Sequence, residues 1–348
     1  MVYYNNLETL KELRCPVEFL YSECGYYRMD KYPFVDFIDK IGSYEIYKTD
    51  YFNIMCSSDR KSYLFKDMSI RASLIKSNEL VQNKDEYFPV KVSSDGKIEL
   101  LDGQHRVSGM IYNGCTHINV SIKYISPDWE DFVKKLRFFY DNDGGQIYSP
   151  IEHPLFSEWK VARKPGREKI ISDCSQEVRS KHGEITWVHW DIGSMSDYLC
   201  RHLRNTGLNV LGFDFNREIV TIAERLNHVF KTDIGYYHCE DFMSVLRECG
   251  DNSVGSISCI SVLHHWLNQG RQEDFIEAVG LMLDKAQILF IDMDNPATGY
   301  VLNNNTTIPV DKNGFGEWLK LSGKYCKYIG ECELGRPIYV ASKYYDIE

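Results

Sequence analysis

The sequence predicts an α/β protein built from two domains. Its 348 residues are enough for two hydrophobic cores, and 43% of them are hydrophobic, as expected for a folded globular chain. From residue 185 onward, apolar strand-like runs alternate with amphipathic helix-like runs, which predicts a mostly parallel sheet with helices on both faces. Shorter elements before residue 127 predict a smaller α+β domain. We therefore expect domains over residues 1–126 and 182–348, joined by a connector over 127–181.

The N-terminal part shows its clearest pattern between residues 69 and 122. Its periodicity predicts a helix over 69–82, because the apolar positions recur at helical spacing. Asp95-Gly96 is a tight-turn dipeptide between two β-prone runs, so a hairpin is expected there. The elements that follow the first helix are strands over 88–92 and 97–101, a helix over 104–112 that Asn113-Gly114 ends, and a strand over 117–122.

The loop Asp102-Gly103-Gln104-His105-Arg106 separates the hairpin from the next helix. A helix N-terminus presents unbonded N–H groups and favours anions. Gly103, Gln104, His105 and Arg106 could therefore hold a nucleotide phosphate, and the Arg106 guanidinium suits bidentate contact. Asp102 could hold a metal ion or act as a base. The alternative is an ordinary helix start with solvated charges.

The connector is too long to be only a linker. It contains one expected helix over residues 129–140 and a basic stretch over 160–169. Its role as a cover for one of the sites stays open.

The C-terminal part predicts a doubly wound sheet. The clearest helix covers residues 218–230, where Ile219, Ile222 and Leu226 fall on one face. The expected strands cover 185–190, 208–213, 234–238, 254–262 and 286–292, and a closing antiparallel pair covers 325–330 and 338–341.

Polar residues follow four of these strands, at the sheet edge where open α/β folds bind ligands. Asp191, Gly193 and Ser194 follow the first strand, and Gly193 would let a ligand approach the backbone. Asp214 and Phe215 end the second strand, where an acid can hydrogen-bond a ribose. The remaining candidates are Glu240 and Asp241 after the third strand, and Ser261, His264 and His265 after the fourth.

This order resembles the class I S-adenosylmethionine-dependent methyltransferases, over residues 185–343. The resemblance implies a seven-stranded Rossmann-like sheet and S-adenosylmethionine as cofactor, held by the residues named for the first four strands. Many family members have Gly-x-Gly-x-Gly, whereas Asp197 stands here where a glycine is common. Asp197 could bind the cofactor's amino group or weaken the site. The alternative is another dinucleotide-binding fold, although Gly-x-Gly-x-x-Gly is absent.

The residues after the fourth strand constrain the methyl acceptor. A hydroxyl acceptor needs a base, and His264 or His265 could supply it; a phosphate acceptor does not need one. The alternative is that one of the two is a structural histidine. The Asn/Asp-Pro-Pro-Tyr motif of amino-methylating DNA enzymes is absent there. We expect a small-molecule or glycan-end acceptor and an O-methyltransferase.

Residues 69–125 resemble the ParB/sulfiredoxin-like fold, whose members include nucleotide-hydrolysing partition proteins and free-serine kinases. Sulfiredoxins have a cysteine where Gln104 stands, so that activity is not expected. The resemblance implies ATP or another nucleotide with Mg²⁺ as a second cofactor, and catalytic roles for Asp102, His105 and Arg106. The predicted function is therefore phosphorylation followed by methylation. The alternatives are a nucleic-acid-associated methyltransferase and an inactive N-terminal binding module.

Charge and cysteine content narrow the class of protein. The formal net charge is −10, which disfavours tight nucleic-acid binding. No apolar run reaches transmembrane length, and the N-terminus lacks the pattern of a signal peptide. Eleven scattered cysteines without CxxC spacing are typical of reduced, buried thiols. We expect a cytoplasmic protein; its oligomeric state is left open.

Overall fold

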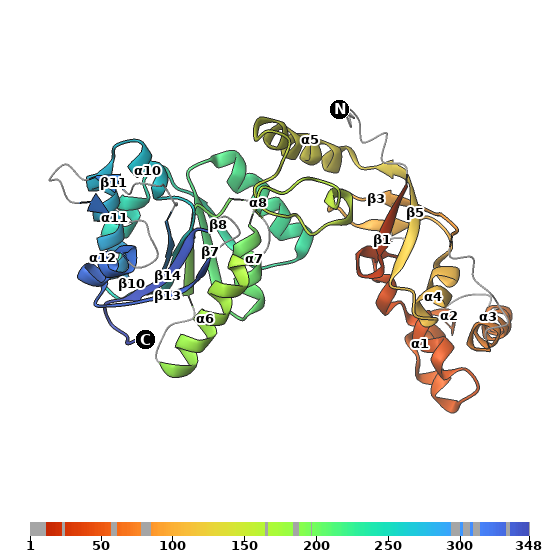
Figure 1. Ribbon diagram of the computed structural model, residues 1–348. Coiled ribbons are helices and arrows are strands. Elements are labelled where there is room, and N and C mark those ends of the chain that lie inside the picture. Colours follow the sequence, from red (N-terminus) through yellow and green to blue (C-terminus); the bar gives the residue numbers. More distant parts are fainter. Residues whose placement is uncertain are drawn as a thin grey trace. The chain divides into compact units, whose positions relative to one another are not determined.

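The computed structural model divides the chain into two compact units (Figure 1). Unit 1 comprises Met1–Phe139 and Glu152–Trp159, and unit 2 comprises Tyr140–Ile151 and Lys160–Glu348. The structure describes residues 12–22, 25–56, 61–77, 85–163, 166–183, 188–195, 197–293, 300–301, 307–308, 314–331 and 335–347.

Unit 1 is built on a five-stranded mixed sheet of order β1-β5-β3-β4-β2. The predicted hairpin is β3 and β4, which pair antiparallel with Val90 opposite Leu100. β5 then runs parallel to β3, and α4 connects β4 to β5. The bounds are β1 Glu12–Pro16, β2 Leu20–Tyr21, β3 Phe88–Val92, β4 Ile98–Leu100, α4 Gln104–Tyr112 and β5 His117–Ile125.

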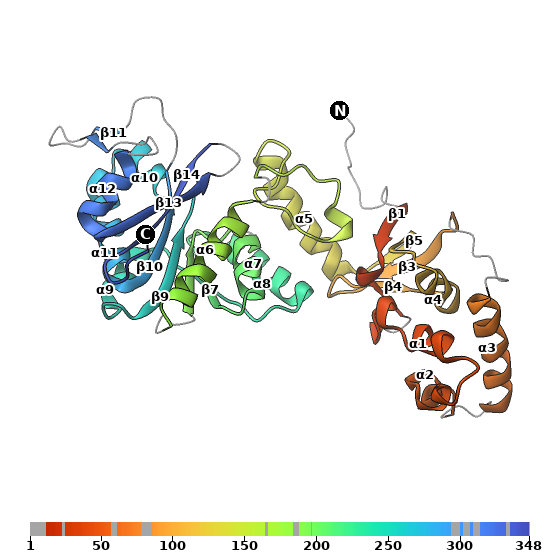
Figure 2. The same cartoon turned by 60° about the horizontal axis from the view of Figure 1, so that its bottom comes forward.

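Three helices pack together at one end of unit 1, as Figure 2 shows. They are α1 (Pro33–Lys40), α2 (Asp50–Cys56) and α3 (Lys61–Lys76). Phe34, Phe37 and Ile38 of α1 are fully buried in their common core. The helix predicted over 69–82 is thus displaced: α3 starts eight residues earlier, and residues 78–84 lie outside the described part. The first sixty residues, which have no clear period, supply two of these helices, α1 and α2, which are stabilised by tertiary packing rather than predicted by a sequence pattern.

The segment after β5 belongs to both units. It contains α5 (Pro127–Asn142), the short 3₁₀ helix η6 (Pro154–Phe156) and α6 (Arg167–Lys181). η6 packs in unit 1, where the buried His153 ring hydrogen-bonds through Nε2 to the Gly96 carbonyl at 2.9 Å. In unit 2, an isolated bridge pairs Ile147 with Val161.

Unit 2 has a seven-stranded sheet of order β13-β14-β10-β9-β6-β7-β8. β6 to β10 are all parallel, and β14 pairs antiparallel with both β10 and β13. This is the doubly wound sheet with a closing hairpin that the sequence predicts. The strands are β6 Val188–Ile192, β7 Asn209–Asp214, β8 Gly235–His238, β9 Val254–Cys259, β10 Ala286–Asp292, β13 Tyr325–Glu331 and β14 Pro337–Ser342.

Helices cover both faces of this sheet (Figure 1). Alternation along β10 explains the two cores: Leu289 and Ile291 join one cluster, and Ile288 and Phe290 join the other. The first cluster is completed by α9 (Phe242–Glu248), α10 (His264–Asn268), α11 (Gln272–Lys285) and α12 (Gly314–Gly323), and the second by α6, α7 (Tyr198–Asn205) and α8 (Arg217–Phe230).

The fourth strand of unit 2 is shorter than predicted. It ends at Cys259 rather than at residue 262, because Ser261 has a left-handed backbone with φ of 60°. A small hairpin, β11 (Tyr300–Val301) with β12 (Thr307–Ile308), lies outside the main sheet. Among the described helices, none has the length and apolar character needed to cross a membrane.

Candidate active site

The carboxyl ends of β6 to β10 bring the predicted residues of unit 2 to one edge of the sheet. Asp191 lies on β6, Asp214 ends β7, Glu240 and Asp241 follow β8, and Ser261 follows β9. Because the four strands are parallel and adjacent, residues far apart in sequence meet at this edge.

Asp191 is buried and held from two sides. Ser258 Oγ on the neighbouring β9 donates to Asp191 Oδ1 at 2.5 Å, and Cys200 Sγ of α7 donates to Oδ2 at 3.3 Å. Burial raises the pKa of the Asp191 carboxyl to about 6, although both hydrogen bonds oppose the rise. The Asp191 carboxyl is therefore protonated more readily than that of an exposed aspartate.

A buried chain of hydrogen bonds continues from Asp191 into the sheet. His189 Nε2 lies 2.9 Å from Ser258 Oγ, and His189 Nδ1 lies 2.8 Å from Ser256 Oγ. Ser258 donates to Asp191, so its oxygen accepts from His189 Nε2–H, and Nδ1 must then accept from Ser256. Burial lowers the pKa of His189 to about 3, which agrees with a neutral ring. Sequence reasoning missed His189 and the two serines because they read as ordinary strand residues.

Gly193 turns the chain from β6 toward α7. Its φ is 74°, and a Cβ there would lie 2.4 Å from Val262 Cγ2. The Gly193 and Ser194 N–H groups both donate to the Phe213 carbonyl, at 2.8 and 3.1 Å, which fixes the loop against the end of β7. The Ser194 hydroxyl is buried and has no hydrogen-bond partner among the described residues.

Asp214 organises the turn after β7. Its carboxylate accepts from the Met195 N–H at 3.2 Å and from the Asn216 N–H at 2.9 Å. Burial raises the pKa of Asp214, and these backbone donors oppose the rise. Phe215 follows with 76% of its surface exposed. An exposed aromatic ring beside a buried acid is a suitable arrangement for a heterocycle bound above a ribose.

The two acids after β8 have different surroundings. The Glu240 side chain is 84% exposed and lies 3.8 Å from His238 Nε2. Asp241 caps α9, because its carboxylate accepts from the Ser244 N–H at 3.2 Å and from the Ser244 hydroxyl. The Asp241 carboxylate is thus engaged within its own turn, whereas Glu240 is open to a ligand.

Ser261 is locked by an acid that the sequence analysis did not single out. The Ser261 N–H donates to Asp292 Oδ1 at 2.6 Å, and its hydroxyl donates to Oδ2 at 3.2 Å. Arg336 Nη1 donates to Ser261 Oγ at 3.1 Å. All three residues lie at ends of neighbouring strands or just beyond them. The network supports the strained Ser261 backbone. Asp292 and Arg336 are far from Ser261 in the sequence, and the folded sheet brings them beside it.

His264 and His265 begin α10, just beyond Ser261. Their ring centroids are 4.1 Å apart. His264 is 4% exposed, and His265 is exposed. The pair therefore offers one buried and one accessible imidazole beyond the fourth strand.

Asp197 adopts a left-handed backbone at the N-terminus of α7. Its φ is 72°, which aspartate tolerates better than most residues. The side chain is buried, and Oδ1 accepts from Arg201 Nε at 3.2 Å. The Arg201 guanidinium in turn lies 3.9 Å from the centroid of the Phe230 ring. This carboxylate anchors the start of α7.

A further cation reaches the strand ends from α6. Arg167 is buried, pairs with Glu168 at 3.2 Å and donates to the Tyr148 hydroxyl at 3.3 Å. Its charge lowers the pKa of the Asp191 and Asp292 carboxyls, against the larger effect of burial. Residues of the predicted connector thus lie within electrostatic range of this edge.

The loop singled out in unit 1 is built differently. Gly103 has φ of 91° and starts α4, but His105 turns inward, with Nε2 2.5 Å from the Tyr51 hydroxyl and its ring 4.7 Å from that of Phe34. Burial lowers the pKa of His105 to about 4. The His105 ring therefore packs among aromatic residues of unit 1, and its phosphate-binding role stays a prediction.

The other residues of this loop are at the surface. Arg106 pairs with Glu86 and, at 3.0 Å, with Asp102, whose side chain is 75% exposed. Gln104 is half-buried and its carbonyl accepts from the Ser108 hydroxyl at 2.7 Å. The Arg106 guanidinium, which the sequence predicts to bind a phosphate, is thus paired with the carboxylates of Glu86 and Asp102.

Comparison with known proteins identifies the class of the C-terminal unit. Residues 190–290 match the family model described as a methyltransferase domain. The C-terminal half of this chain thus contains a methyltransferase domain, as its resemblance predicts. The match starts inside β6 and ends inside β10, so it contains most of the edge described above.

Among solved structures, the chain is similar to the bifunctional kinase-methyltransferase WbdD. The identity is 17%, the TM-score is 0.50, and the match covers 61% of this chain and 46% of WbdD. The chain thus spans less than half the length of that protein, and the likeness concerns the fold. Magnesium protoporphyrin IX methyltransferase from Synechocystis PCC 6803, solved with bound S-adenosylmethionine, matches at 13% identity and a TM-score of 0.39, over 61% of this chain and 97% of that one. No curated protein matches the chain. The resemblance of residues 69–125 to the ParB/sulfiredoxin-like fold stays a prediction.

Proposed function

We propose that this chain is an S-adenosylmethionine-dependent O-methyltransferase that acts on a small molecule or a glycan end. The observation that carries the proposal is the convergence of Asp191, Gly193 and Asp214 at the carboxyl edge of a methyltransferase-type sheet. Asp214 would bind the ribose hydroxyls, and Phe215 would cover the adenine. Ser194 has a buried hydroxyl free for the cofactor, and Glu240 is open to the adenine amino group.

The reaction needs little covalent chemistry from the protein. The methyl group moves from the sulfonium sulfur to the acceptor oxygen, the S–C bond breaks as the O–C bond forms, and S-adenosylhomocysteine leaves. Positioning of the two reactants supplies most of the rate. The acceptor's O–H proton needs a base, and His265 is the accessible imidazole while His264 orients it from the buried side.

Calorimetric titration of the full chain with S-adenosylmethionine tests the cofactor assignment. We expect one site per chain in the wild type and weaker binding in Asp214→Ala. The absence of binding by the wild type would refute it. Methyl transfer to hydroxyl-bearing acceptors then tests the reaction, and His265→Asn should lose rate without losing cofactor affinity.

Nucleotide use by unit 1 is a second candidate function. It is favoured by the partly exposed Arg106 guanidinium, 43% accessible, at the N-terminus of α4. In this proposal a nucleotide phosphate displaces Glu86 and Asp102 from Arg106, and Asp102 is released to bind Mg²⁺. His105 would have to leave Tyr51 to take part. Turnover of ATP or CTP by the full chain, abolished in Arg106→Ala, is the expected result. If the wild type neither hydrolyses ATP or CTP nor transfers a phosphoryl group from either, unit 1 is a binding module rather than a kinase.

A further inference from the structure

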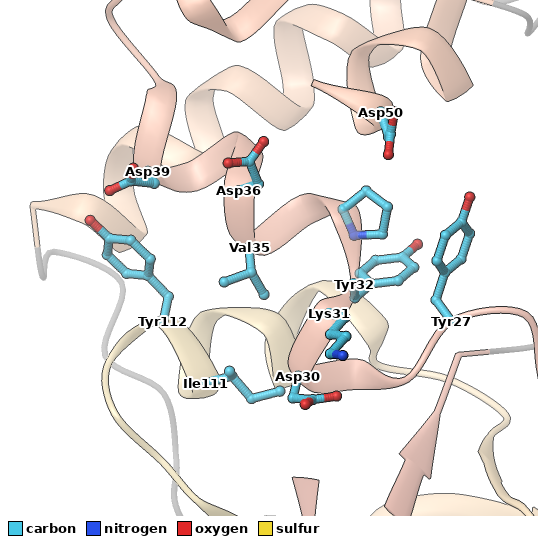
Figure 3. Close-up of a pocket in the computed structure, with 11 residues that line it drawn as sticks. Tyr27, Asp30, Lys31, Tyr32, Val35, Asp36, Asp39, Asp50, Ile111 and Tyr112 are labelled. Carbon is cyan, nitrogen blue, oxygen red and sulfur yellow. The ribbon is translucent and has the colours of Figure 1, made fainter. Parts of the chain in front are cut away.

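Unit 1 contains a cavity of about 650 Å³ that no predicted site residue lines (Figure 3). This volume is in the range of small-molecule binding sites. The 3₁₀ helix η4 (Met29–Lys31), α1, the first residue of α2 and the end of α4 form its walls. The cavity lies wholly within one unit, and none of residues 102–106 lines it.

The polar part of the wall is rich in acceptors. Asp36, Asp39 and Asp50 project from α1 and α2 on one side, and Asp30 projects from the opposite side (Figure 3). Two of these carboxylates are held in place by cations. Asp36 pairs with Lys40 at 3.0 Å, and Asp30 accepts from Arg28 Nε at 2.9 Å. A carboxylate in an ion pair keeps lone pairs for further donors, so these groups are oriented acceptors.

The rest of the wall offers aromatic and aliphatic surface. Val35 and Ile111 lie in the middle and on the floor, and Tyr112 lies at one end (Figure 3). The rings of Tyr27 and Tyr32 pack edge to face, with centroids 6.0 Å apart. Rings and short aliphatic groups beside acceptors can pack on the C–H face of a ligand while the carboxylates bind its edge.

This lining excludes several ligand classes. The four carboxylates outnumber the three cations beside them, Lys31, Arg28 and Lys40, and therefore disfavour a free phosphate or carboxylate. No three acidic, histidine or cysteine residues of the described chain are grouped to hold a metal ion, so a metal-bridged nucleotide is not favoured either. A polycation is favoured only weakly, because Arg28 and Lys40 already balance two of the carboxylates. What remains is a neutral ligand with many donors and an apolar face.

We propose that this cavity binds a carbohydrate, with pyranose hydroxyls donating to Asp39 and Asp50 and a sugar face packed on the tyrosine rings. The proposal extends the proposed function by giving unit 1 a role in holding a glycan acceptor. Sugar binding does not require methyl transfer, so each proposal can fail without the other.

Saturation-transfer NMR on the full chain, without methyl donor, tests this proposal. The probes are the methyl α-pyranosides of glucose, mannose and galactose, with N-acetylglucosamine, and spermidine as a cationic comparison. We expect at least one sugar to bind, with a dissociation constant on the order of 1 mM that barely changes with salt. Failure of all four sugars, or binding of spermidine in their place, would overturn the proposal.

Variants locate the binding to the cavity. Asp39→Ala and Asp50→Ala are exposed changes and should each weaken sugar binding by about tenfold, since a hydrogen bond to a charged group is lost. As a control, Asp128→Ala removes an exposed acid of α5 in the same unit and should leave sugar binding unchanged. Asp39→Asn and Asp50→Asn, which keep the shape of the side chain and remove its charge, provide second variants if an alanine variant fails to fold. Unchanged sugar binding in both alanine variants, or in both asparagine variants, would place the sugar elsewhere and refute the proposal.

Discussion

The two glycine turns of this chain have the same local build and very different surroundings. Gly103 and Gly193 each leave a strand, adopt a left-handed backbone and precede a helix. A Cβ would lie 2.5 Å from Phe88 in the first turn and 2.4 Å from Val262 in the second. Both positions therefore require glycine for the same steric reason.

The difference lies in the strands beside each turn. Gly193 follows β6, which has parallel neighbours on both sides, so their loops supply Asp214 and Ser261 to the same edge. Gly103 follows β4, which has one antiparallel neighbour, β3, and one parallel neighbour, the two-residue strand β2. The chain segment beside it on the β3 side therefore belongs to the start of a strand, not to a loop that follows one. The local sequence predicts the turn in both cases, but sheet topology decides whether a turn is joined by other polar groups.

The largest effect is expected for Gly193→Ala. The added methyl group would meet Val262, and a left-handed backbone at a non-glycine residue costs about 1–3 kcal/mol. We expect loss of measurable cofactor binding and a lower melting temperature. Gly280→Ala is the matched control, because it lies in α11 with open space around it and should raise the free energy of unfolding slightly. Wild-type affinity in Gly193→Ala would show that the loop does not approach the cofactor.

A smaller effect is expected for Asp214→Ala. The change removes the ribose acceptor and leaves the Met195 and Asn216 N–H groups without it, at a cost of about 1–3 kcal/mol, or roughly ten- to a hundredfold in the dissociation constant. Glu240→Ala removes an exposed acid at the same edge and should weaken cofactor binding less than Asp214→Ala does. Calorimetry with S-adenosylmethionine measures both. Equal losses in the two variants would contradict the ribose role of Asp214.

Ser258→Ala should shift a pH dependence rather than abolish binding. In the wild type, we expect cofactor affinity to fall as the pH drops through about 6, because Asp191 is protonated there. The Ser258 hydrogen bond stabilises the charged carboxylate, so its loss raises the pKa of Asp191. The fall in cofactor affinity at low pH, the acid limb of the profile, should then begin at a higher pH. Ser256→Ala removes only the bond to His189 and should leave the limb in place. Titrations across this pH range compare the three proteins, and an unshifted limb in Ser258→Ala would remove Asp191 from cofactor binding.

Sequence patterns predicted the sheet of unit 2 because strands such as β9 and β10 are buried on both faces and amphipathic helices separate the parallel strands. They also placed Asp191, Gly193 and Asp214 at strand ends, since position in a parallel sheet follows from strand order alone. They could not supply His189, Ser258, Asp292 or Arg336, whose partners are 31 to 75 residues away. They could not show that His105 turns inward either, because the aromatic residues around it come from a region without periodicity.

The smallest effect on methyl transfer is expected for Arg106→Ala. Its two ion pairs are partly exposed, so their loss should lower the free energy of unfolding by only about 0.2–1 kcal/mol. Cofactor affinity and the methyl-transfer rate should stay at wild-type values, because Asp214 and Gly193 belong to a separate compact unit with its own core. Differential scanning calorimetry with and without ATP and Mg²⁺ gives the decisive comparison. If the nucleotide stabilises the wild type but not Arg106→Ala, a phosphate does displace Glu86 and Asp102, and the two glycine turns are both ligand sites. If neither protein responds, the turn in unit 1 is a helix start held by ion pairs, and the glycine turn alone has no binding function here.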